Sequence, residues 1–452
     1  MNTQASFYCK EKTDSGGPFI GRCVGLLALV GILVTPIHAH ALTASEIFVR
    51  FCEGGEKLLV NTFDDHEDAE GCTAEDCSLR EAVNAANLCP LGSPGNVQLR
   101  NGTYTLNQAG FDTYLPIIGD VWIYGGSATT IKPYEPAQAG SAFSISKHAK
   151  LNLRKNLTIK NFRSSDGTIR VAQHGYLKLN RVTLRDNAGA RVISNAGDTR
   201  IVKSTLTENV STTGSVMHNS GLFKISFSTI SNNDAGLCIV DNRANDGRKL
   251  VVQYSTLSGN RHVYAAICAW EDTDTRIVDS TIVNNHGDAG LGTGGVWGGW
   301  SSSALEISNS IIANNTPSDC IIPNQGLVSA TSKGTNLDGD GSCTAIPELN
   351  FTLSMDPMLE PLAHNKGPNQ THMPVWGSPV IDAGDTCKGR DQVSRERPVD
   401  GNLDSISRCD IGAMEFQPDY TVDAGPLTCA ISVGGCDDSQ ISTGNNPPDF
   451  GL

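Results

Sequence analysis

Lys203-Ser-Thr-Leu-Thr-Glu-Asn209 is one copy of the short pattern that decides the fold of this chain. The Asn that closes the pattern recurs every 22 to 30 residues through the middle of the sequence. The other copies are Asn156-Leu-Thr-Ile-Lys-Asn161, Arg181-Val-Thr-Leu-Arg-Asp-Asn187, Phe227-Ser-Thr-Ile-Ser-Asn-Asn233, Tyr254-Ser-Thr-Leu-Ser-Gly-Asn260, Asp279-Ser-Thr-Ile-Val-Asn-Asn285 and Asn309-Ser-Ile-Ile-Ala-Asn-Asn315. A period of this length indicates stacked repeats, each one a structural unit that lies on the next.

Short strands precede each copy. Leu177 and Leu179 flank Lys178, and this alternation is typical of a strand with one buried face. Aliphatic residues recur at the position of Leu179 in the later repeats: Ile201, Ile225, Val252, Ile277 and Ile307. No helical pattern of useful length lies between the strands, and a propeller or sandwich would need antiparallel hairpins with turn dipeptides. The sequence therefore predicts an all-β fold, a right-handed parallel β-helix in which the closing Asn side chains form a ladder.

One end of such a stack must be covered. Ser78 and Glu81 have the spacing of a helix capping box, and Leu79, Ala82, Val83 and Ala86 would share one face of the helix that follows. We expect a short N-terminal capping helix that lies across the first coil.

The N-terminus has the features of a secretory signal peptide. Basic residues precede an apolar run from Val24 to Val34, and Ala39-His40-Ala41 follows as a small-x-small cleavage site. We interpret residues 1–41 as the signal, with an N-terminal membrane anchor as the alternative. No second long apolar stretch follows, so no membrane span is expected in the mature chain, which we expect to be monomeric and either extracellular or part of the cell envelope.

Cysteine usage agrees with export. The mature segment keeps 12 of the 14 cysteines, because Cys9 and Cys23 lie in the leader. An even number of cysteines in an exported chain indicates disulfides. The candidate pairs are Cys72 with Cys77, Cys238 with Cys268, Cys387 with Cys409, and Cys429 with Cys436. The formal net charge of -14 argues against nucleic acid as a partner.

Two end motifs resemble a known family. Cys77-Ser-Leu-Arg-Glu-Ala82 is similar to the start of the secreted bacterial proteins named for a CSLREA motif, and Asn101-Gly-Thr-Tyr-Thr-Leu106 fits the strand that follows there. Gly377-Ser-Pro-Val-Ile-Asp-Ala-Gly384 and Cys409-Asp-Ile-Gly-Ala-Met-Glu415 resemble the closing region of choice-of-anchor β-helix proteins. The resemblance implies an exported β-helix of the broad pectate-lyase-like class, with no established reaction. We expect a cap region over 42–94, the β-helix over 95–416 and a loose tail over 417–452.

A basic row is expected on the outer face. The residue before each inward aliphatic is Lys178, Arg200, Lys224, Val251, Arg276 or Glu306. Stacked cations repel one another, and an anion between them relieves the repulsion. We therefore predict a groove that binds an acidic polysaccharide along the coil axis, with a solubilising surface as the alternative.

Candidate catalytic residues lie close by. Glu271 to Asp274 form an acidic loop beside Arg276, and Lys249 would lie one coil below Asp274. Asp272 and Asp274 could hold Ca²⁺ against a sugar carboxylate while Lys249 or Arg276 acts as base. An ordinary polar loop would show the same residues.

Trp297 and Trp300 follow a Gly-rich loop and could stack on sugars, or they could cover a corner of the core. The sequence favours a non-catalytic secreted module that contacts carbohydrate or acts in adhesion. A Ca²⁺-dependent polysaccharide lyase and a structural envelope protein are the alternatives.

Overall fold

The computed structural model describes residues 48–418, apart from 70, 107–113, 136–138, 244–247, 271, 289–292, 299–302, 324–328, 348, 350, 352, 386 and 388. The expected signal peptide, the Cys429–Cys436 pair, Glu271 and Trp300 lie outside the described residues.

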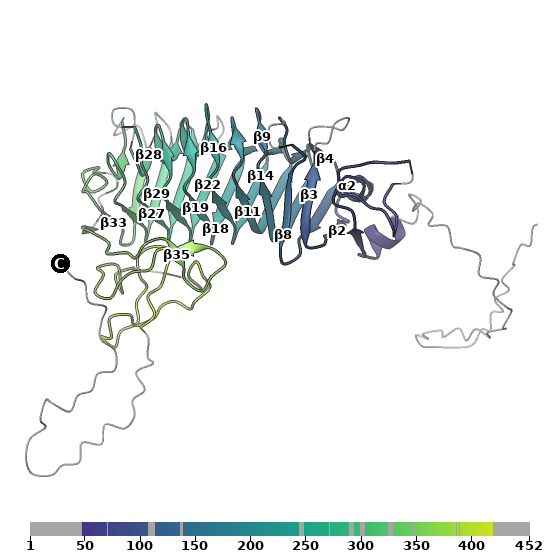
Figure 1. The fold of residues 1–452 in the computed structure, drawn as a ribbon. Coiled ribbons are helices and arrows are strands. Elements are labelled where there is room, and N and C mark those ends of the chain that lie inside the picture. Colours follow the sequence, from purple (N-terminus) through teal and green to yellow (C-terminus); the bar gives the residue numbers. More distant parts are fainter. Residues whose placement is uncertain are drawn as a thin grey trace, which may run out of the picture. The chain divides into compact units, whose positions relative to one another are not determined.

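The described chain winds into a stack of parallel coils, a right-handed parallel β-helix (Figure 1). This confirms the predicted fold class. The largest sheet is bent along its length into two strips. Its first strip consists of β1 (Lys57–Val60), β2 (Gly95–Leu99), β5 (Asp120–Tyr124), the first half of β8 (Lys150–Lys160), the first half of β11 (Tyr176–Arg185), β14 (Asp198–Val202), β18 (Leu222–Ser226), β22 (Arg248–Gln253), β26 (Thr273–Val278), β29 (Ala304–Ser308) and β32 (Ser329–Lys333).

The second strip follows a corner at which one residue in most coils has a positive φ. It consists of β3 (Gly102–Leu106), β6 (Thr129–Pro133), the second halves of β8 and β11, β15 (Thr205–Thr207), β19 (Thr229–Ser231), β23 (Thr256–Ser258), β27 (Thr281–Val283), β30 (Ile311–Ala313), β33 (Leu337–Asp338) and β34 (Leu353–Ser354).

Two further parallel sheets close each coil. One contains β4 (Leu115–Ile117), β7 (Phe143–Ile145), β10 (Ile169–Val171), β13 (Ile193–Asn195), β17 (Met217–Asn219), β21 (Cys238–Asn242), β25 (Ala265–Ala269), β28 (Val296–Gly298) and β31 (Cys320–Ile321). The other contains the two-residue strands β9 (Arg163–Ser164), β12 (Ala188–Gly189), β16 (Val210–Ser211), β20 (Asp234–Ala235) and β24 (Arg261–His262).

The core fills the inside of the coils. Leu179 pairs in register with Ile201, and the same row continues through Ile225, Val252, Ile277 and Ile307. All of these side chains are fully buried, as the alternation in the sequence predicts. Each aliphatic residue therefore packs against its equivalents in the coils above and below, at the strand spacing of about 4.8 Å.

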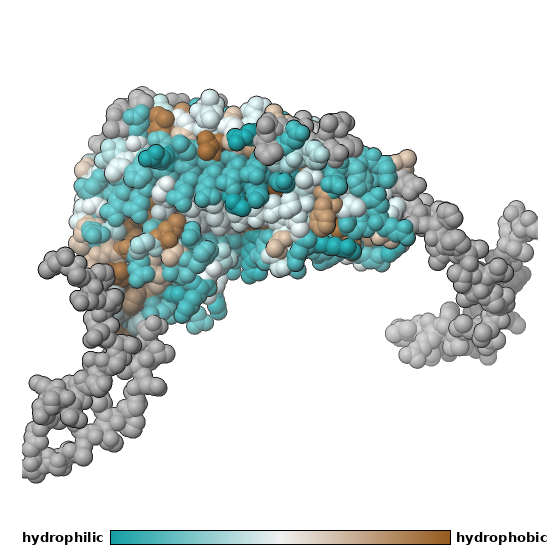
Figure 2. Space-filling view, viewed as in Figure 1, coloured by the Kyte–Doolittle hydropathy of each residue, from teal (hydrophilic) through white to brown (hydrophobic). Residues whose placement is uncertain are grey.

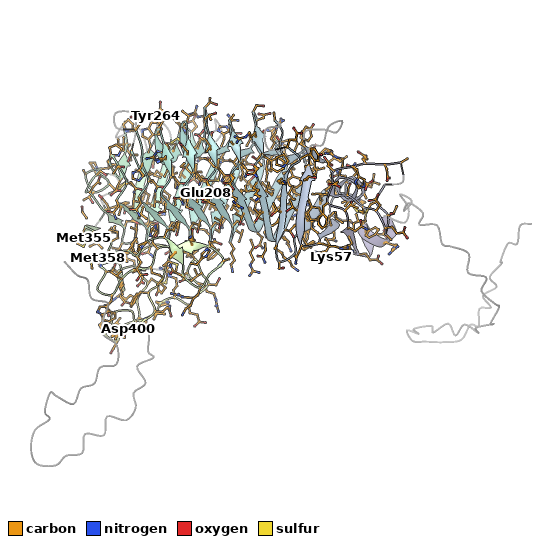
Figure 3. All side chains as sticks on the ribbon, viewed as in Figure 1. Lys57, Glu208, Tyr264, Met355, Met358 and Asp400 are labelled. Carbon is orange, nitrogen blue, oxygen red and sulfur yellow. A yellow bond between two sulfur atoms is a disulfide. The ribbon has the colours of Figure 1, made fainter. Side chains whose placement is uncertain are left out.

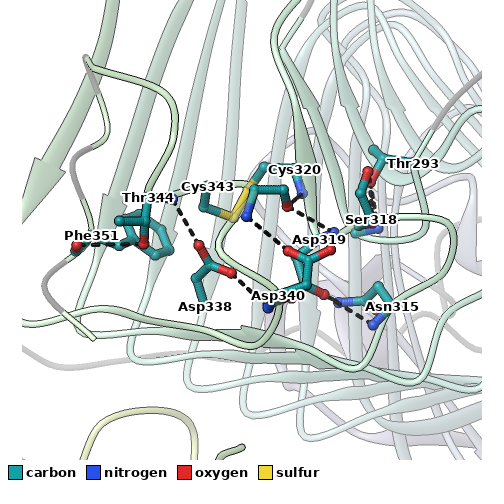
Figure 4. Close-up of a disulfide and its surroundings, with 12 residues drawn as sticks. Thr293, Asn315, Ser318, Asp319, Cys320, Asp338, Asp340, Cys343, Thr344 and Phe351 are labelled. Atoms are coloured by element: carbon teal, nitrogen blue, oxygen red, sulfur yellow. Dashed lines mark hydrogen bonds between the residues drawn. A yellow bond between two sulfur atoms is a disulfide. The ribbon is translucent and has the colours of Figure 1, made fainter. Parts of the chain in front are cut away.

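Buried asparagines run along one corner of the core and confirm the predicted ladder from Asn187 to Asn315. The first copy does not join it, because Phe162, and not Asn161, donates its backbone N–H to Oδ1 of Asn187. The amide nitrogen of Asn187 donates to Oδ1 of Asn209 at 3.0 Å, and the chain of donors continues to Asn315. Each Oδ1 also accepts the backbone N–H of the preceding ladder Asn, at 3.0 to 3.1 Å. Asp319 ends the ladder by accepting both N–H groups of Asn315, next to the Cys320–Cys343 disulfide (Figure 4).

The N-terminal coil is covered by α2 (Leu79–Ala86), preceded in the chain by the π-helix η1 (Phe48–Glu53). Ser78 and Glu81 form the expected capping box, and the apolar face of α2 is buried. A buried ion pair of 2.7 Å between Arg80 and Asp65 anchors the helix to the loop before it. Among the described residues, the structure contains no helix that is long and apolar enough to cross a membrane.

Residues 359–416 lie against the second strip instead of adding coils to the stack (Figure 1). We call this segment the lateral module; it contains an antiparallel pair, β35 (Ala363–His364) and β36 (Gln370–Thr371). The hydroxyl of Thr229 donates to the Gln370 carbonyl at 2.6 Å, and that of Thr256 donates to Oε1 of Gln392 at 2.7 Å. The sequence analysis extends the β-helix to 416, whereas the described strands of the stack end with β34.

Disulfides lie both within the stack of coils and in the segments that pack against it. The described residues contain the expected pairs Cys72–Cys77, Cys238–Cys268 and Cys387–Cys409. Cys52–Cys89 and Cys320–Cys343 were not expected. Cys238–Cys268 joins strands β21 and β25 of neighbouring coils.

Replacing Asn233 by Ala should lower the free energy of unfolding by about 3 kcal/mol or more, because it leaves several buried polar groups of adjacent coils without partners. Denaturant unfolding measures the loss. Asn232→Gly is the matched control, since Asn232 is exposed and has a φ of 54° that Gly adopts freely. A loss in Asn233→Ala no larger than that of the control would contradict a stabilising ladder.

His262 should make stability fall at acid pH. Burial lowers the pKa of His262 from 6.5 to about 4, while its Nε2 donates to the Gly294 carbonyl at 3.1 Å. Folding therefore favours the neutral ring. Its contribution to the free energy of unfolding is fully present above pH 6.5 and is lost as the pH falls to 4. Between pH 7 and pH 4 the wild type should lose about 3 kcal/mol more than His262→Asn. Parallel pH profiles in denaturant unfolding would refute this.

Candidate functional site

Three cations that form no ion pair with any described residue lie at the corner between the two strips. Arg181 occupies the corner opposite Lys155, and Lys203 follows one coil further on. All three have a positive φ, between 49° and 64°, which turns the chain from one strip to the next. Lys155 and Arg181 are exposed and Lys203 is partly exposed. Within the described residues, none of the three forms an ion pair, and Nζ of Lys203 donates to Oγ of Ser394 at 3.0 Å.

A ladder of threonines lies beside these cations on the second strip. The outward residues of successive coils are in register: Thr103, Thr130, Thr158, Thr183, Thr205, Thr229, Thr256 and Thr281. The last three are buried beneath the lateral module, and the first five are at least partly exposed. The open part of the ladder therefore presents a row of hydroxyl groups to the solvent.

The cations and threonines line one groove. A cavity of about 530 Å³ is bounded by Arg181 and Lys203 at the corner and by Thr158 and Thr183 on the strip. Pro368 and Asn369 of the lateral module also line it. Arg181 and Lys203 also line a depression of about 310 Å³ beside Lys155 and Tyr124, on the side of the first strip. Figure 2 shows that the visible surface over the coils is largely hydrophilic.

Aromatic rings flank the groove on the first strip. The Arg154 guanidinium lies 4.2 Å from the centre of the Trp122 ring, and Lys57 Nζ lies 4.3 Å from that of Tyr124. Figure 3 shows Lys57 near the N-terminal end of the stack. Trp122 and Tyr124 are both partly exposed. Each ring therefore already has a cation over one face, and a sugar could stack only on a face that these cations leave free.

The structure places the predicted basic row in a single line. Lys178, Arg200 and Lys224 are in register, and the line continues through Val251, Arg276 and Glu306. Arg200 pairs with Asp198 at 3.0 Å, and this hydrogen bond raises the pKa of the guanidinium. Arg276 lies 3.7 Å from Asp274 and 4.0 Å from Glu306. Of the row's described cations, Lys178 and Lys224 form no ion pair, so its net positive charge is smaller than the sequence suggests.

The expected lyase cluster is only partly assembled. Lys249 and Asp274 are in register, with Nζ 3.1 Å from Oδ2. Asp274 therefore lies between two cations, Lys249 and Arg276, and a Ca²⁺ ion would have to compete with both. Asp272 lies at a turn with a φ of 52°. Elsewhere in the described chain, three ligand atoms converge to within 4.8 Å in two groups: His66, Asp76 and Glu81, and Asp319, Asp338 and Asp340.

Trp297 packs against protein. Its side chain is 4% exposed, and its ring centre lies 4.4 Å from that of Trp270 and 6.2 Å from that of Tyr264. This cluster surrounds the Cys238–Cys268 disulfide. The ring is buried as the core-covering alternative expects, but in a cluster separate from the main core of the coils.

No family model matches the chain, and no curated protein matches it. A solved structure described as the crystal structure of pectate lyase Pel9A aligns with 81% of this chain and 99% of its own. The TM-score is 0.41 and the sequence identity is 12%.

The corner cations are not among the residues predicted from the sequence, although the repeats carry a signal for them. Arg181 and Lys203 are the first residues of two aligned repeats, where later repeats have Phe227, Tyr254 and Asp279. A comparison of that one column across the repeats would have shown basic residues in early coils and aromatic or acidic residues in later ones. The aligned Thr of the same repeats marks the ladder.

Proposed function

We propose that this protein is an exported, non-catalytic module that binds an acidic polysaccharide along the coil axis, in the groove beside Lys155, Arg181 and Lys203. The observation that carries the proposal is the row of three cations, without an ion pair among the described residues, next to a ladder of exposed hydroxyl groups, in a chain whose net charge is -14. The basic row at Lys178 and Lys224 would extend the positive surface on the first strip.

Charge supports an anionic ligand. In an acidic protein, three neighbouring cations without carboxylate partners gain nothing from one another, because stacked like charges repel. An anion placed between them relieves that repulsion. The long, flexible Lys and Arg side chains can follow a polymer whose acidic groups are irregularly spaced.

The repeat also fits a polymer. Neighbouring coils are about 4.8 Å apart, so the three cations span about 10 Å along the axis, the length of a short stretch of saccharide. The threonine hydroxyl groups can donate to or accept from sugar hydroxyls. Trp122 and Tyr124 offer flat faces for sugar rings at the edge of the groove.

The five disulfides among the described residues fit an oxidising compartment and therefore export. We further propose membership of the CSLREA-motif and choice-of-anchor β-helix proteins. The proposal rests on the motif residues 77–82, which begin the helix that covers the first coil.

Charge reversal in Arg181→Glu/Lys203→Glu should weaken retention on an immobilised acidic polysaccharide such as pectate or alginate. Two of the three groove cations become anions, so we expect at least a 10-fold loss of affinity at low ionic strength. Retention of the wild type should also fall as salt is added, because partly exposed charges are screened. Affinity chromatography and titration calorimetry measure both effects.

Lys147→Glu/Arg163→Glu is the matched control, since it makes the same charge change at two exposed residues outside the groove. An equal loss of affinity in the control would mean that net charge alone, and not the groove, determines retention. Unchanged retention of the groove variant would refute the site. An increase in absorbance from unsaturated product with Ca²⁺, abolished by Asp272→Asn or Asp274→Asn, would replace the binding module with the lyase.

A further inference from the structure

Three side chains beside the capping helix bring one donor atom each into a small group. Nε2 of His66 lies 3.1 Å from Oδ1 of Asp76 and 3.4 Å from Oε2 of Glu81, and all three atoms lie within 4.8 Å of one another. His66 and Asp76 belong to the loop before α2, and Glu81 lies in the first turn of that helix. One imidazole nitrogen and two carboxylate oxygens are a donor set that divalent transition metals prefer.

Two of these atoms are buried and form no hydrogen bond. Nε2 of His66 and Oδ1 of Asp76 have no hydrogen-bond partner among the residues that the structure describes. They are close enough for a hydrogen bond with each other, but the relative orientation of the two groups does not allow one. Buried polar atoms normally have a partner, and their absence requires an explanation. A cation bound by both atoms supplies that partner.

The distances fit a four-coordinate zinc ion. Zn²⁺ binds nitrogen and oxygen ligands at about 2.0 to 2.2 Å in tetrahedral geometry, which places neighbouring ligand atoms about 3.3 Å apart. The two distances from Nε2 of His66, 3.1 and 3.4 Å, lie on either side of this value. Ca²⁺ fits less well, because it takes about six to eight oxygen ligands and does not favour imidazole.

Hydrogen bonds to neighbouring residues hold the three donor residues in place. The backbone N–H of Ser78 donates to Oε2 of Glu81 at 2.8 Å, and the Ser78 hydroxyl donates to the His66 carbonyl at 2.6 Å. The backbone N–H of Asp76 donates to Oγ1 of Thr73 at 2.9 Å, which fixes the turn that carries this carboxylate. Binding therefore needs little rearrangement of the chain, and this keeps its entropic cost low.

The charge around the group favours a cation. Residues 64–81 contain eight acidic side chains and one basic side chain, Arg80, which is paired with Asp65. No described Lys or Arg forms an ion pair with Asp76 or Glu81, so a metal ion would not compete there with a fixed cation, as it would at Asp274. The His66 and Asp76 side chains are 30% and 48% exposed, so an ion can approach from the solvent.

The second group of converging carboxylates differs in both respects. Asp319, Asp338 and Asp340 accept backbone N–H groups from the loop that follows them. Their oxygens therefore already have donors, and the group offers no nitrogen ligand. Only the group at His66 combines a mixed donor set with buried atoms that lack hydrogen bonds.

We propose that His66, Asp76 and Glu81 bind one Zn²⁺ ion, with water as the fourth ligand, and that this ion stabilises the segment that covers the first coil. Two ligands come from the loop before α2 and the third from the helix itself, so the ion joins the loop to the helix. Its role is structural, and it acts in addition to the capping box and the Arg80–Asp65 ion pair.

The test uses the full chain without a polyhistidine tag, stripped with EDTA and titrated with ZnCl₂ alone. No reductant is added, so the disulfides stay closed. We expect calorimetry and elemental analysis to give one Zn²⁺ per chain, and Zn²⁺ to raise the midpoint of thermal unfolding. His66→Ala and Asp76→Asn should each weaken binding by about 10-fold or more and remove the thermal shift. His364→Ala is the matched control, because His364 is exposed and lies outside the group.

Two outcomes would overturn the proposal. One is a wild type that binds no Zn²⁺ although its circular dichroism shows the folded β-helix. The other is wild-type affinity in Asp76→Asn, which keeps the size of the side chain and so stays informative even where His66→Ala does not fold. Loss of binding in Asp340→Asn alone would equally assign the ion to the second group. None of these results depends on glycan retention, so this site and the groove can fail separately.

Discussion

Hydrogen bonding between buried asparagines of successive coils is the constraint on which the rest of the structure depends. An amide group inside the core is costly unless both its donor and its acceptor find partners. In this chain those partners are the Asn side chain and the backbone of the next coil. A coil whose Asn was displaced along the chain would leave its neighbour unsatisfied. The ladder therefore fixes the register of the coils from β11 to β30.

Because the register is fixed, equivalent residues of successive coils form rows on the outer surface. Once Asn209 is aligned with Asn233, the residues around them are aligned as well, and each column of the repeat becomes a line on the outside. The threonine ladder and the corner cations both follow from this one alignment. The insertions that lengthen individual repeats leave the strands in step.

The sequence predicted the features that depend on a period. Alternating Leu and Ile identified the inward face, the closing Asn identified the ladder, and Ser78 with Glu81 identified the cap. Cys238 and Cys268 are one repeat apart, which predicted their bond. Cys320 and Cys343 have a similar spacing, so the same reasoning could have found that pair.

Other features depend on contacts that no period reveals. The corner residues were not predicted because a positive φ at Arg181 and Lys203 interrupts the alternation of inward and outward side chains. The direction of these two side chains therefore cannot be read from the pattern. The lateral module was not predicted because residues 359–416 contain no repeat. The hydrogen-bond partners of Gln370 and Gln392 also lie more than a hundred residues earlier in the chain.

The residues at the corner also explain why the early part of the threonine ladder is open and the later part is buried. In the early coils the corner carries Lys155, Arg181 and Lys203, and the ladder is open. In the later coils it carries the stacked rings of Phe227 and Tyr254, and then Asp279.

The lateral module uses those later residues. Asn369 donates to the Phe227 carbonyl at 2.7 Å, and the buried guanidinium of Arg397 lies 3.6 Å from Asp279 and 2.9 Å from Glu415. A cation at position 279 would repel Arg397 inside the interface, where no water could screen the charge. Changes at the corner therefore determine where the module can dock, and the last cation of the column marks the end of the groove.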